Sequence, residues 1–225
     1  MDSFARCRAV VFDAYGTLFD VAAPTRALLG ELADEVGQLW RRKQLEYSWL
    51  RSLIGRHADF AQVTAEALDY ALEAHGITDA GLAARLREAY LTLPAYDDAA
   101  EVLTALRQSG RRTAILSNGS PAMLAPMVTR SGLSPLLELL MSVEDVAIFK
   151  PHPKAYSLAC DRLACPAQDI AFVSANGWDA AGAATFGFSV AWLNRRGEPE
   201  DRLSARPAAQ IASLAALPAL FGIGA

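Results

Sequence analysis

The chain opens with a short apolar segment and continues with a long stretch of helical pattern. Residues 8–13 form an apolar run that ends in Asp13, and Gly16 then permits a turn. From Pro24 to about Tyr90 the apolar side chains instead recur every three or four positions, the spacing of amphipathic helices. Breaks in this helical pattern fall at Gly55, at His75-Gly76 and at Pro94. The pattern predicts one buried strand followed by about four helices.

After Pro94 the pattern changes to an alternation of helices and strands. Predicted strands cover residues 113–117, 139–143, 170–174 and 189–193, and predicted helices cover 98–108 and begin near Pro121, Pro153 and Trp178. Such an alternation implies crossover connections and a parallel sheet with helices on both faces. We therefore expect an α/β fold, a doubly wound Rossmann-like parallel sheet with a helical cap inserted after the first strand. The core domain would comprise residues 1–19 and 96–225, and the cap residues 20–95.

Composition excludes several classes of protein. The 225 residues include 25 acidic and 21 basic side chains, a formal charge of −4, and no basic cluster. Nucleic acid binding is therefore not expected, because phosphates require a positive face. The longest apolar tract, residues 211–225, is too short and too interrupted to cross a bilayer, so no membrane association is expected. Without a signal peptide pattern, and with three cysteines that show no C-x-x-C spacing, we expect a cytoplasmic protein with reduced thiols.

Polar residues follow four of the predicted strands. They are Asp13 with Thr17, Ser117 with Asn118, Lys150, and the set Ser174, Asn176 and Asp179. In open α/β sheets ligands bind outside the carboxyl ends of the strands, so we expect these side chains to converge in one crevice. Such residues can also simply cap turns and helix starts. That alternative explains Asp13 and Lys150 less well, because charges beside apolar strands are costly unless they are paired or functional.

Four short motifs, in this order, resemble those of the haloacid dehalogenase superfamily. They are Asp13-Ala14-Tyr15-Gly16-Thr17-Leu18, Ser117-Asn118-Gly119, Lys150-Pro151 and Asn176-Gly177-Trp178-Asp179. Most members of this superfamily are magnesium-dependent phosphatases, in which a second Asp two residues after the nucleophile protonates the leaving oxygen. Tyr15 stands at that position and cannot serve as a carboxylic acid. Asp13 and Asp179 alone also make a thin set of magnesium ligands, so we expect neither a metal nor another cofactor.

The helical segment narrows the resemblance. Residues 39–51 are similar to the cap helix of the (S)-2-haloacid dehalogenases, also called type II L-2-haloacid dehalogenases. Residues 149–153 and 172–174 resemble other segments of the same subfamily. This resemblance implies metal-independent hydrolysis of short (S)-2-haloalkanoic acids to (R)-2-hydroxyalkanoic acids and halide through a covalent ester on Asp13. Two positions depart from the pattern: Arg42 replaces the usual Gln, and Ala175 stands where a second Ser is common.

The same resemblance implies a role for each site residue. Asp13 would attack the carbon that bears the halogen, Lys150 would keep it ionised, and Thr17 and Ser174 would orient the two carboxylates. The substrate carboxylate would meet Ser117 and the backbone amides near Ala14 and Tyr15, while Arg41, Asn118 and Trp178 would hold the halide. Asn176 and Asp179 would direct the hydrolytic water, Tyr156 would support activity, and Leu45 and Phe60 would line the alkyl pocket with Trp178. For Arg41, Tyr156 and Phe60, ordinary surface or core packing is the competing interpretation.

Two other functions remain open on the sequence alone. One is a magnesium-dependent phosphatase of the same fold, and the other is a non-catalytic, receiver-like binding module in which Asp13 accepts a phosphoryl group or caps a loop. The expected partners are a small 2-haloacid substrate and its halide product. A homodimer is also expected, because the family often forms dimers and the helical segment offers apolar surface.

Overall fold

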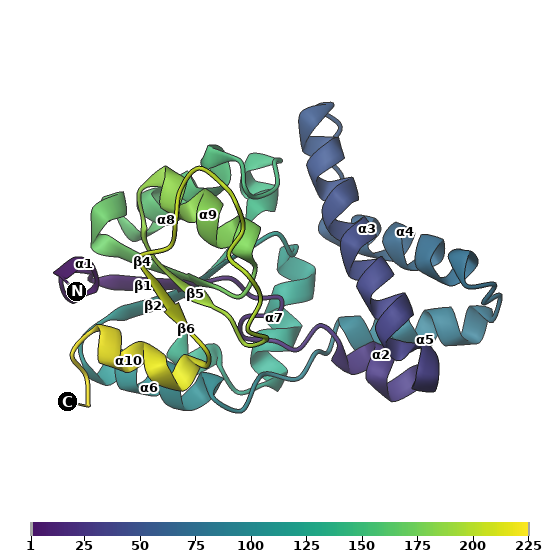
Figure 1. Ribbon diagram of the computed structural model, residues 1–225, viewed down its shortest axis with the longest axis horizontal. Helices are drawn as coiled ribbons and strands as arrows, with labels where there is room; N and C mark the ends of the chain where they lie inside the picture. The colour runs from purple at the N-terminus through teal and green to yellow at the C-terminus, as the bar shows by residue number, and fades with distance from the viewer. Residues whose placement is uncertain (1, 225) are drawn as a thin grey trace.

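The computed structural model describes residues 2–224 and contains one six-stranded parallel sheet (Figure 1). The strands are β1 (Ala9–Phe12), β2 (Arg112–Ser117), β3 (Leu139–Ser142), β4 (Ile170–Ser174), β5 (Ser189–Leu193) and β6 (Ala209–Ile211). Their order is β3-β2-β1-β4-β5-β6, and every neighbouring pair is parallel. The predicted α/β fold class is confirmed, and β1 lies at the centre of the sheet, where the order of strands reverses.

Helices cover both faces of the sheet. They are α1 (Asp2–Ala5), α6 (Ala99–Gln108), α7 (Pro121–Arg130), α8 (Pro153–Leu163), α9 (Gly177–Phe186) and α10 (Leu217–Leu220). Successive residues of β1 point to opposite faces: Val10 joins the hydrophobic cluster with α6, α7 and α10, and Val11 the cluster with α8 and α9. This double burial explains why β1 reads as an unbroken apolar run and not as an alternating one.

Four helices between β1 and α6 lie to one side of the sheet in Figure 1. They are α2 (Ala23–Leu28), α3 (Ala33–Leu53), α4 (Phe60–Ala74) and α5 (Ala80–Tyr90), and together we call them the helical unit. The predicted breaks at Gly55 and Gly76 are confirmed, and both glycines adopt the left-handed backbone conformation that ends a helix, with φ of 66° and 67°. Asp59 and Asp79 then cap α4 and α5 by accepting hydrogen bonds from backbone N–H groups of the first turn.

The pattern analysis did not predict several short elements. These are β6, α1, α10 and the 3₁₀ turns η1 (Gly30–Leu32), η2 (Ser134–Leu136), η3 (Val143–Val146), η4 (Ala167–Asp169) and η5 (Leu214–Ala216). Elements of three or four residues are too short to show a helix or strand period. Within residues 2–224, no helix combines the length and the apolar character that a membrane crossing requires. All three cysteines are unpaired thiols, as expected.

Candidate active site

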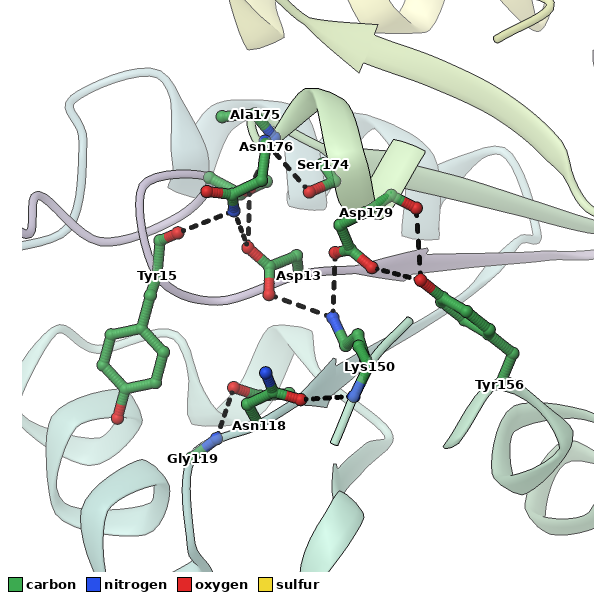
Figure 2. A network of polar contacts seen from close by, with 12 residues as sticks. Asp13, Tyr15, Asn118, Gly119, Lys150, Tyr156, Ser174, Ala175, Asn176 and Asp179 are labelled. Atoms are coloured by element: carbon green, nitrogen blue, oxygen red, sulfur yellow. Dashed lines mark hydrogen bonds and ion pairs between the residues drawn. The ribbon is translucent and has the colours of Figure 1, made fainter. Parts of the chain in front are cut away.

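The polar residues that follow the strands meet at the carboxyl edge of the sheet (Figure 2). Asp13 comes directly after β1, Ser117 ends β2, and Ser174 ends β4. Asp179 lies in the first turn of α9, and Lys150 lies in the segment before α8. Because all the strands run in the same direction, residues that are 137 positions apart along the chain, such as Asp13 and Lys150, come into direct contact.

Lys150 is the centre of this network. Its Nζ lies 3.0 Å from Oδ1 of Asp13 and 3.0 Å from Oδ2 of Asp179. The lysine side chain is 1% exposed, and those of Asp13 and Asp179 are 8% and 0% exposed. Burial by itself would lower the pKa of Lys150, but the two carboxylates outweigh burial and raise it. The ammonium ion therefore stays charged in a site that excludes water.

Asp179 is held by two donors. Its Oδ2 accepts a hydrogen bond from Lys150, and its Oδ1 accepts one from the hydroxyl of Tyr156 at 2.7 Å. Burial raises the pKa of Asp179, while Lys150 and Tyr156 oppose this effect. Tyr156 itself is completely buried among aromatic rings on the α8 side of the sheet. Its hydroxyl therefore connects to the polar network through Asp179.

The second oxygen of Asp13 is fixed from the opposite side. Oδ2 accepts hydrogen bonds from Thr17 Oγ1 at 3.1 Å and from Asn176 Nδ2 at 3.0 Å. The Thr17 hydroxyl oxygen in turn accepts one from the backbone N–H of Ala175. Thr17 thus contacts the Asp13 carboxylate directly. The Ser174 hydroxyl, by contrast, accepts a hydrogen bond from the backbone N–H of Asn176, and the structure shows no hydrogen bond from it to Asp13 or Asp179.

The loop after β2 forms another wall of the site. Asn118 Oδ1 accepts a hydrogen bond from the backbone N–H of Lys150, and Ser117 Oγ accepts one from Gly119. A Cβ atom at Gly119 would lie 2.7 Å from the Tyr15 ring, so only glycine permits this close approach. The backbone N–H groups of Ala14 and Tyr15 donate no hydrogen bond to any residue in the range 2–224. They remain free to bind an anion beside Asp13.

The helical unit contributes Arg41. This residue of α3 donates through Nη2 to Oδ1 of Asn176 at 3.2 Å and through Nη1 to Oε1 of Gln44 at 2.6 Å. Gln44 is buried and is held by the Thr64 and Tyr90 hydroxyl groups. Asn176 therefore connects Arg41 to Asp13: its amide oxygen accepts from Arg41, and its amide nitrogen donates to Asp13.

A cavity of about 390 Å³ opens beside this connection. Five of the predicted site residues line it: Tyr15, Arg41, Leu45, Asn176 and Trp178. Asp13 is joined to this cavity through Asn176, which lines it and donates to Oδ2 of Asp13. Phe60 does not line this cavity: its side chain is 1% exposed and packs against the rings of Tyr15 and Phe149. A second cavity of about 430 Å³ shares Arg41 and Leu45 with the first.

The cavity also has charged walls that the sequence analysis missed. They include Asp20, Arg26, Arg195, Arg196, Glu198 and Asp201. Arg195 and Arg196 come two and three residues after the end of β5, so the strand-end rule applied to the first four strands would have found them had it been extended to the fifth.

The arrangement of donors does not favour a metal ion. Among residues 2–224, no three side chains of the His, Cys, Asp and Glu types are grouped so that they could hold one. Between Asp13 and Asp179 lies the Lys150 ammonium group, 3.0 Å from an oxygen of each carboxylate. The two carboxylates are thus neutralised in part by a residue of the chain itself.

Comparisons with known proteins agree on one family. The sequence pattern of the haloacid dehalogenase-like hydrolases matches residues 7–187. "(S)-2-haloacid dehalogenase 1" from Pseudomonas sp. (strain CBS-3) is 46% identical over 95% of this chain and 96% of its own length. "(S)-2-haloacid dehalogenase 4A" from Burkholderia cepacia is 44% identical over 93% of each chain. The solved structure of L-2-haloacid dehalogenase from Xanthobacter autotrophicus with covalently bound chloropropionic acid covers 97% of this chain and 100% of its own, with 38% identity and a TM-score of 0.90.

Proposed function

This chain belongs to the haloacid dehalogenase-like hydrolases, and on that premise we propose that it hydrolyses short (S)-2-haloalkanoic acids to (R)-2-hydroxyalkanoic acids and halide. The observation that supports this reaction most strongly is the position of Lys150, whose ammonium group lies between two buried carboxylates. This ammonium group contacts Oδ1 of Asp13 directly at the carboxyl edge of the sheet. A desolvated, oriented carboxylate of this kind is a nucleophile for carbon.

In the first step, Asp13 attacks C2 of the haloacid and the carbon–halogen bond breaks. Oδ2 of Asp13 accepts two hydrogen bonds, from Thr17 and Asn176, whereas Oδ1 accepts only one, from Lys150. We therefore assign the attack to Oδ1, which keeps a lone pair available. Attack from the side opposite the halogen inverts C2, forms an ester between Asp13 and the acid, and releases halide.

Two groups of donors serve the charges of the substrate. Its carboxylate would bind the free backbone N–H groups of Ala14 and Tyr15, near the start of α7. The buried hydroxyl of Ser117, at the end of β2 shortly before α7, would be a further donor to this carboxylate. The departing halide would be stabilised by Arg41, Asn118 and Trp178. Arg41 and Trp178 line the cavity, and Leu45 there supplies an apolar wall for the alkyl group.

In the second step, water attacks the ester carbonyl carbon of Asp13. Asp179 accepts one proton from this water and passes it to the oxygen that leaves with the hydroxy acid. The second proton of the water is released to solvent, which restores the Asp13 carboxylate and balances the halide that left in the first step. The pKa of Asp179, raised by burial, suits a group that takes up and returns a proton. Asn176, which contacts Asp13 directly, would position the water. C2 keeps its inverted configuration because the bond between C2 and the ester oxygen does not break in this step.

The experiment that tests this function compares two reactions on the same protein. Halide release from (S)-2-chloropropionate is measured with excess chelator, and hydrolysis of an aryl phosphate is measured with magnesium. The proposal predicts halide release that the chelator does not reduce, and no phosphate hydrolysis. Activity on the phosphate alone would favour the metal-dependent phosphatase. Inactivity on both substrates would favour the binding module.

We further propose that the helical unit acts as a cap domain of residues 20–95 over a core of residues 1–19 and 96–225. The contact of Arg41 with Asn176 supports this division, because it brings a helical-unit residue to the carboxyl edge of the sheet. The three free thiols support a cytoplasmic, reducing location.

A homodimer is the assembly that we propose. Four apolar side chains of α3, α4 and the turn after α3 are exposed: Leu50 (48%), Leu53 (81%), Ile54 (68%) and Tyr70 (43%). Several large apolar side chains exposed on one pair of helices are typical of an interface. The molar mass in solution tests the assembly: a dimer that Leu53→Glu dissociates supports it, and a wild-type monomer contradicts it.

A further inference from the structure

Two segments connect the helical unit to the sheet, residues 13–22 and 91–98, and they lie against each other. The backbone N–H of Tyr96 donates to the carbonyl of Leu18 at 2.9 Å, and that of Asp20 donates to the carbonyl of Pro94 at 2.9 Å. Phe19 and Ala95 form an isolated antiparallel bridge between the segments. Any movement of the helical unit relative to Asp13 must therefore change the conformation of these two connections.

Arg195, just after β5, contacts both connections at once. Its guanidinium group makes two hydrogen bonds to the Asp98 carboxylate, of 2.9 and 3.0 Å, and Nη2 also donates to the carbonyl oxygen of Thr17 at 3.3 Å. The same group lies over the ring of Tyr96, 4.0 Å from its centroid. Asp98 is held in turn by the backbone N–H of Leu214. With side chains only 21% and 19% exposed, this ion pair is well shielded from solvent.

Thr17 links this ion pair to the reaction centre. Its carbonyl oxygen accepts from Arg195, while its side chain donates to Asp13 and accepts from Ala175. A shift of Arg195 therefore reaches the nucleophile through one intervening residue. The second connection, residues 91–98, follows α5 directly, so the contact of Arg195 with Asp98 also holds the end of the helical unit in place.

We infer that Arg195 is a positioning residue for the dehalogenation proposed above: with Asp98 it clamps both connections so that Asp13 and Arg41 face one substrate. A planar guanidinium with two parallel hydrogen bonds fixes direction as well as distance, which a lysine cannot do. Small errors in the placement of a nucleophile are costly, since a displacement of about 1 Å lowers a rate by about a hundredfold.

The chain offers a matched control for this ion pair. Arg112 also makes a two-pronged contact with a carboxylate, that of Glu138, and also donates to a backbone carbonyl, that of Leu163. Arg112 begins β2, at the amino edge of the sheet, opposite the edge that carries Asp13. Loss of Arg112 thus removes the same kinds of contact without touching either connection.

The experiment compares Arg195→Met with Arg112→Met in halide release from (S)-2-chloropropionate and in thermal unfolding. We expect Arg195→Met to lower kcat/KM by at least about tenfold, with part of the loss in kcat, while Arg112→Met keeps the wild-type values. Arg195→Lys is expected to recover only part of the loss. If the two methionine variants lose activity in proportion to their loss of melting temperature, or if Arg195→Met keeps full activity, the inference is overturned.

Two further measurements keep the test decisive. Asp98→Asn removes the charge of the partner with little change of shape, and we expect it to reproduce the direction of the Arg195→Met effect even if that variant folds poorly. Amide hydrogen exchange in residues 13–22 and 91–98 reports the clamp without turnover: faster exchange there in Asp98→Asn than in Arg112→Met supports it, and equal exchange overturns it. A wild-type protein that releases no halide would contradict the proposed function, whereas the exchange result decides the clamp by itself.

Discussion

Arg41 and Asn176, 135 residues apart in the sequence, both line the cavity, and Nη2 of Arg41 lies 3.2 Å from Oδ1 of Asn176. Asn176 makes its other amide contact with Asp13, so the guanidinium is held one residue away from the nucleophile. This contact is the clearest sign that the helical unit and the sheet build one site together.

The first prediction concerns that guanidinium. Arg41→Lys keeps the charge but cannot contact Gln44 and Asn176 together, so we expect kcat/KM for halide release to fall about a hundredfold. Arg42→Lys is the matched control, since Arg42 is exposed and makes no hydrogen bond or ion pair with the part of the chain described here. Steady-state kinetics of both variants measure the effect. Equal rates for the two variants would remove Arg41 from the reaction.

The second prediction concerns the stability of the buried network. Lys150→Met leaves Asp13 and Asp179 without their shared cation, and we expect a loss of about 3–5 kcal/mol in the free energy of unfolding together with loss of activity. Adding Asp179→Asn should restore part of the stability and none of the activity. Urea unfolding followed by circular dichroism gives the free energies. Wild-type stability of Lys150→Met would mean that the carboxylates do not depend on the lysine.

The third prediction is the pH dependence at the alkaline end. The ordinary pKa of a lysine is 10.5, and that of Lys150 is raised above it by its two carboxylate neighbours despite burial. Below 10.5 the ammonium is charged in both the folded and the unfolded chain, so its contribution to stability is fully present. That contribution is lost as the pH rises through the raised pKa. We expect halide release to stay level from about pH 8 to about pH 10, and a decline in this range without unfolding would contradict the assignment.

The fourth prediction separates two explanations of Tyr156. Its hydrogen bond to Asp179 lowers the pKa of that carboxyl, so Tyr156→Phe should raise this pKa further. If Asp179 must be ionised to accept a proton, the acid limb of the kcat profile moves to higher pH. Tyr70→Phe, on the exposed face of α4, provides the control. An unchanged acid limb in Tyr156→Phe would show that the tyrosine only fills space.

The parallel sheet and the convergence of the polar residues at its strand ends could be predicted because they follow from local pattern. Buried parallel strands are continuous apolar runs, as in β1, and the residues after them must share one edge. The placement of Ser174 and Phe60 could not be predicted. Whether a serine hydroxyl turns to a carboxylate or to a neighbouring N–H depends on backbone angles two residues away. An aromatic residue at helical spacing looks the same whether it lines a cavity or packs against other rings.

The network around Arg195 illustrates another limit of sequence patterns. Arg195, Asp98 and Thr17 belong to three separate segments, and no local period connects them. Only the parallel register of the sheet places the end of β5 beside the two connections of the helical unit. Contacts of this kind follow from the fold as a whole, so the structure is needed to find them.

The origin of the hydroxyl oxygen tests the central claim most directly. The protein is mixed in excess with (S)-2-chloropropionate in water enriched with heavy oxygen, so that each molecule turns over at most once, and the mass of the lactate is measured. Attack by Asp13 on carbon predicts lactate with ordinary oxygen and a heavy oxygen atom in the peptide that contains Asp13. Heavy oxygen in the lactate of this first turnover, with an unchanged Asp13 peptide, would show that water attacks the substrate directly and would contradict the account.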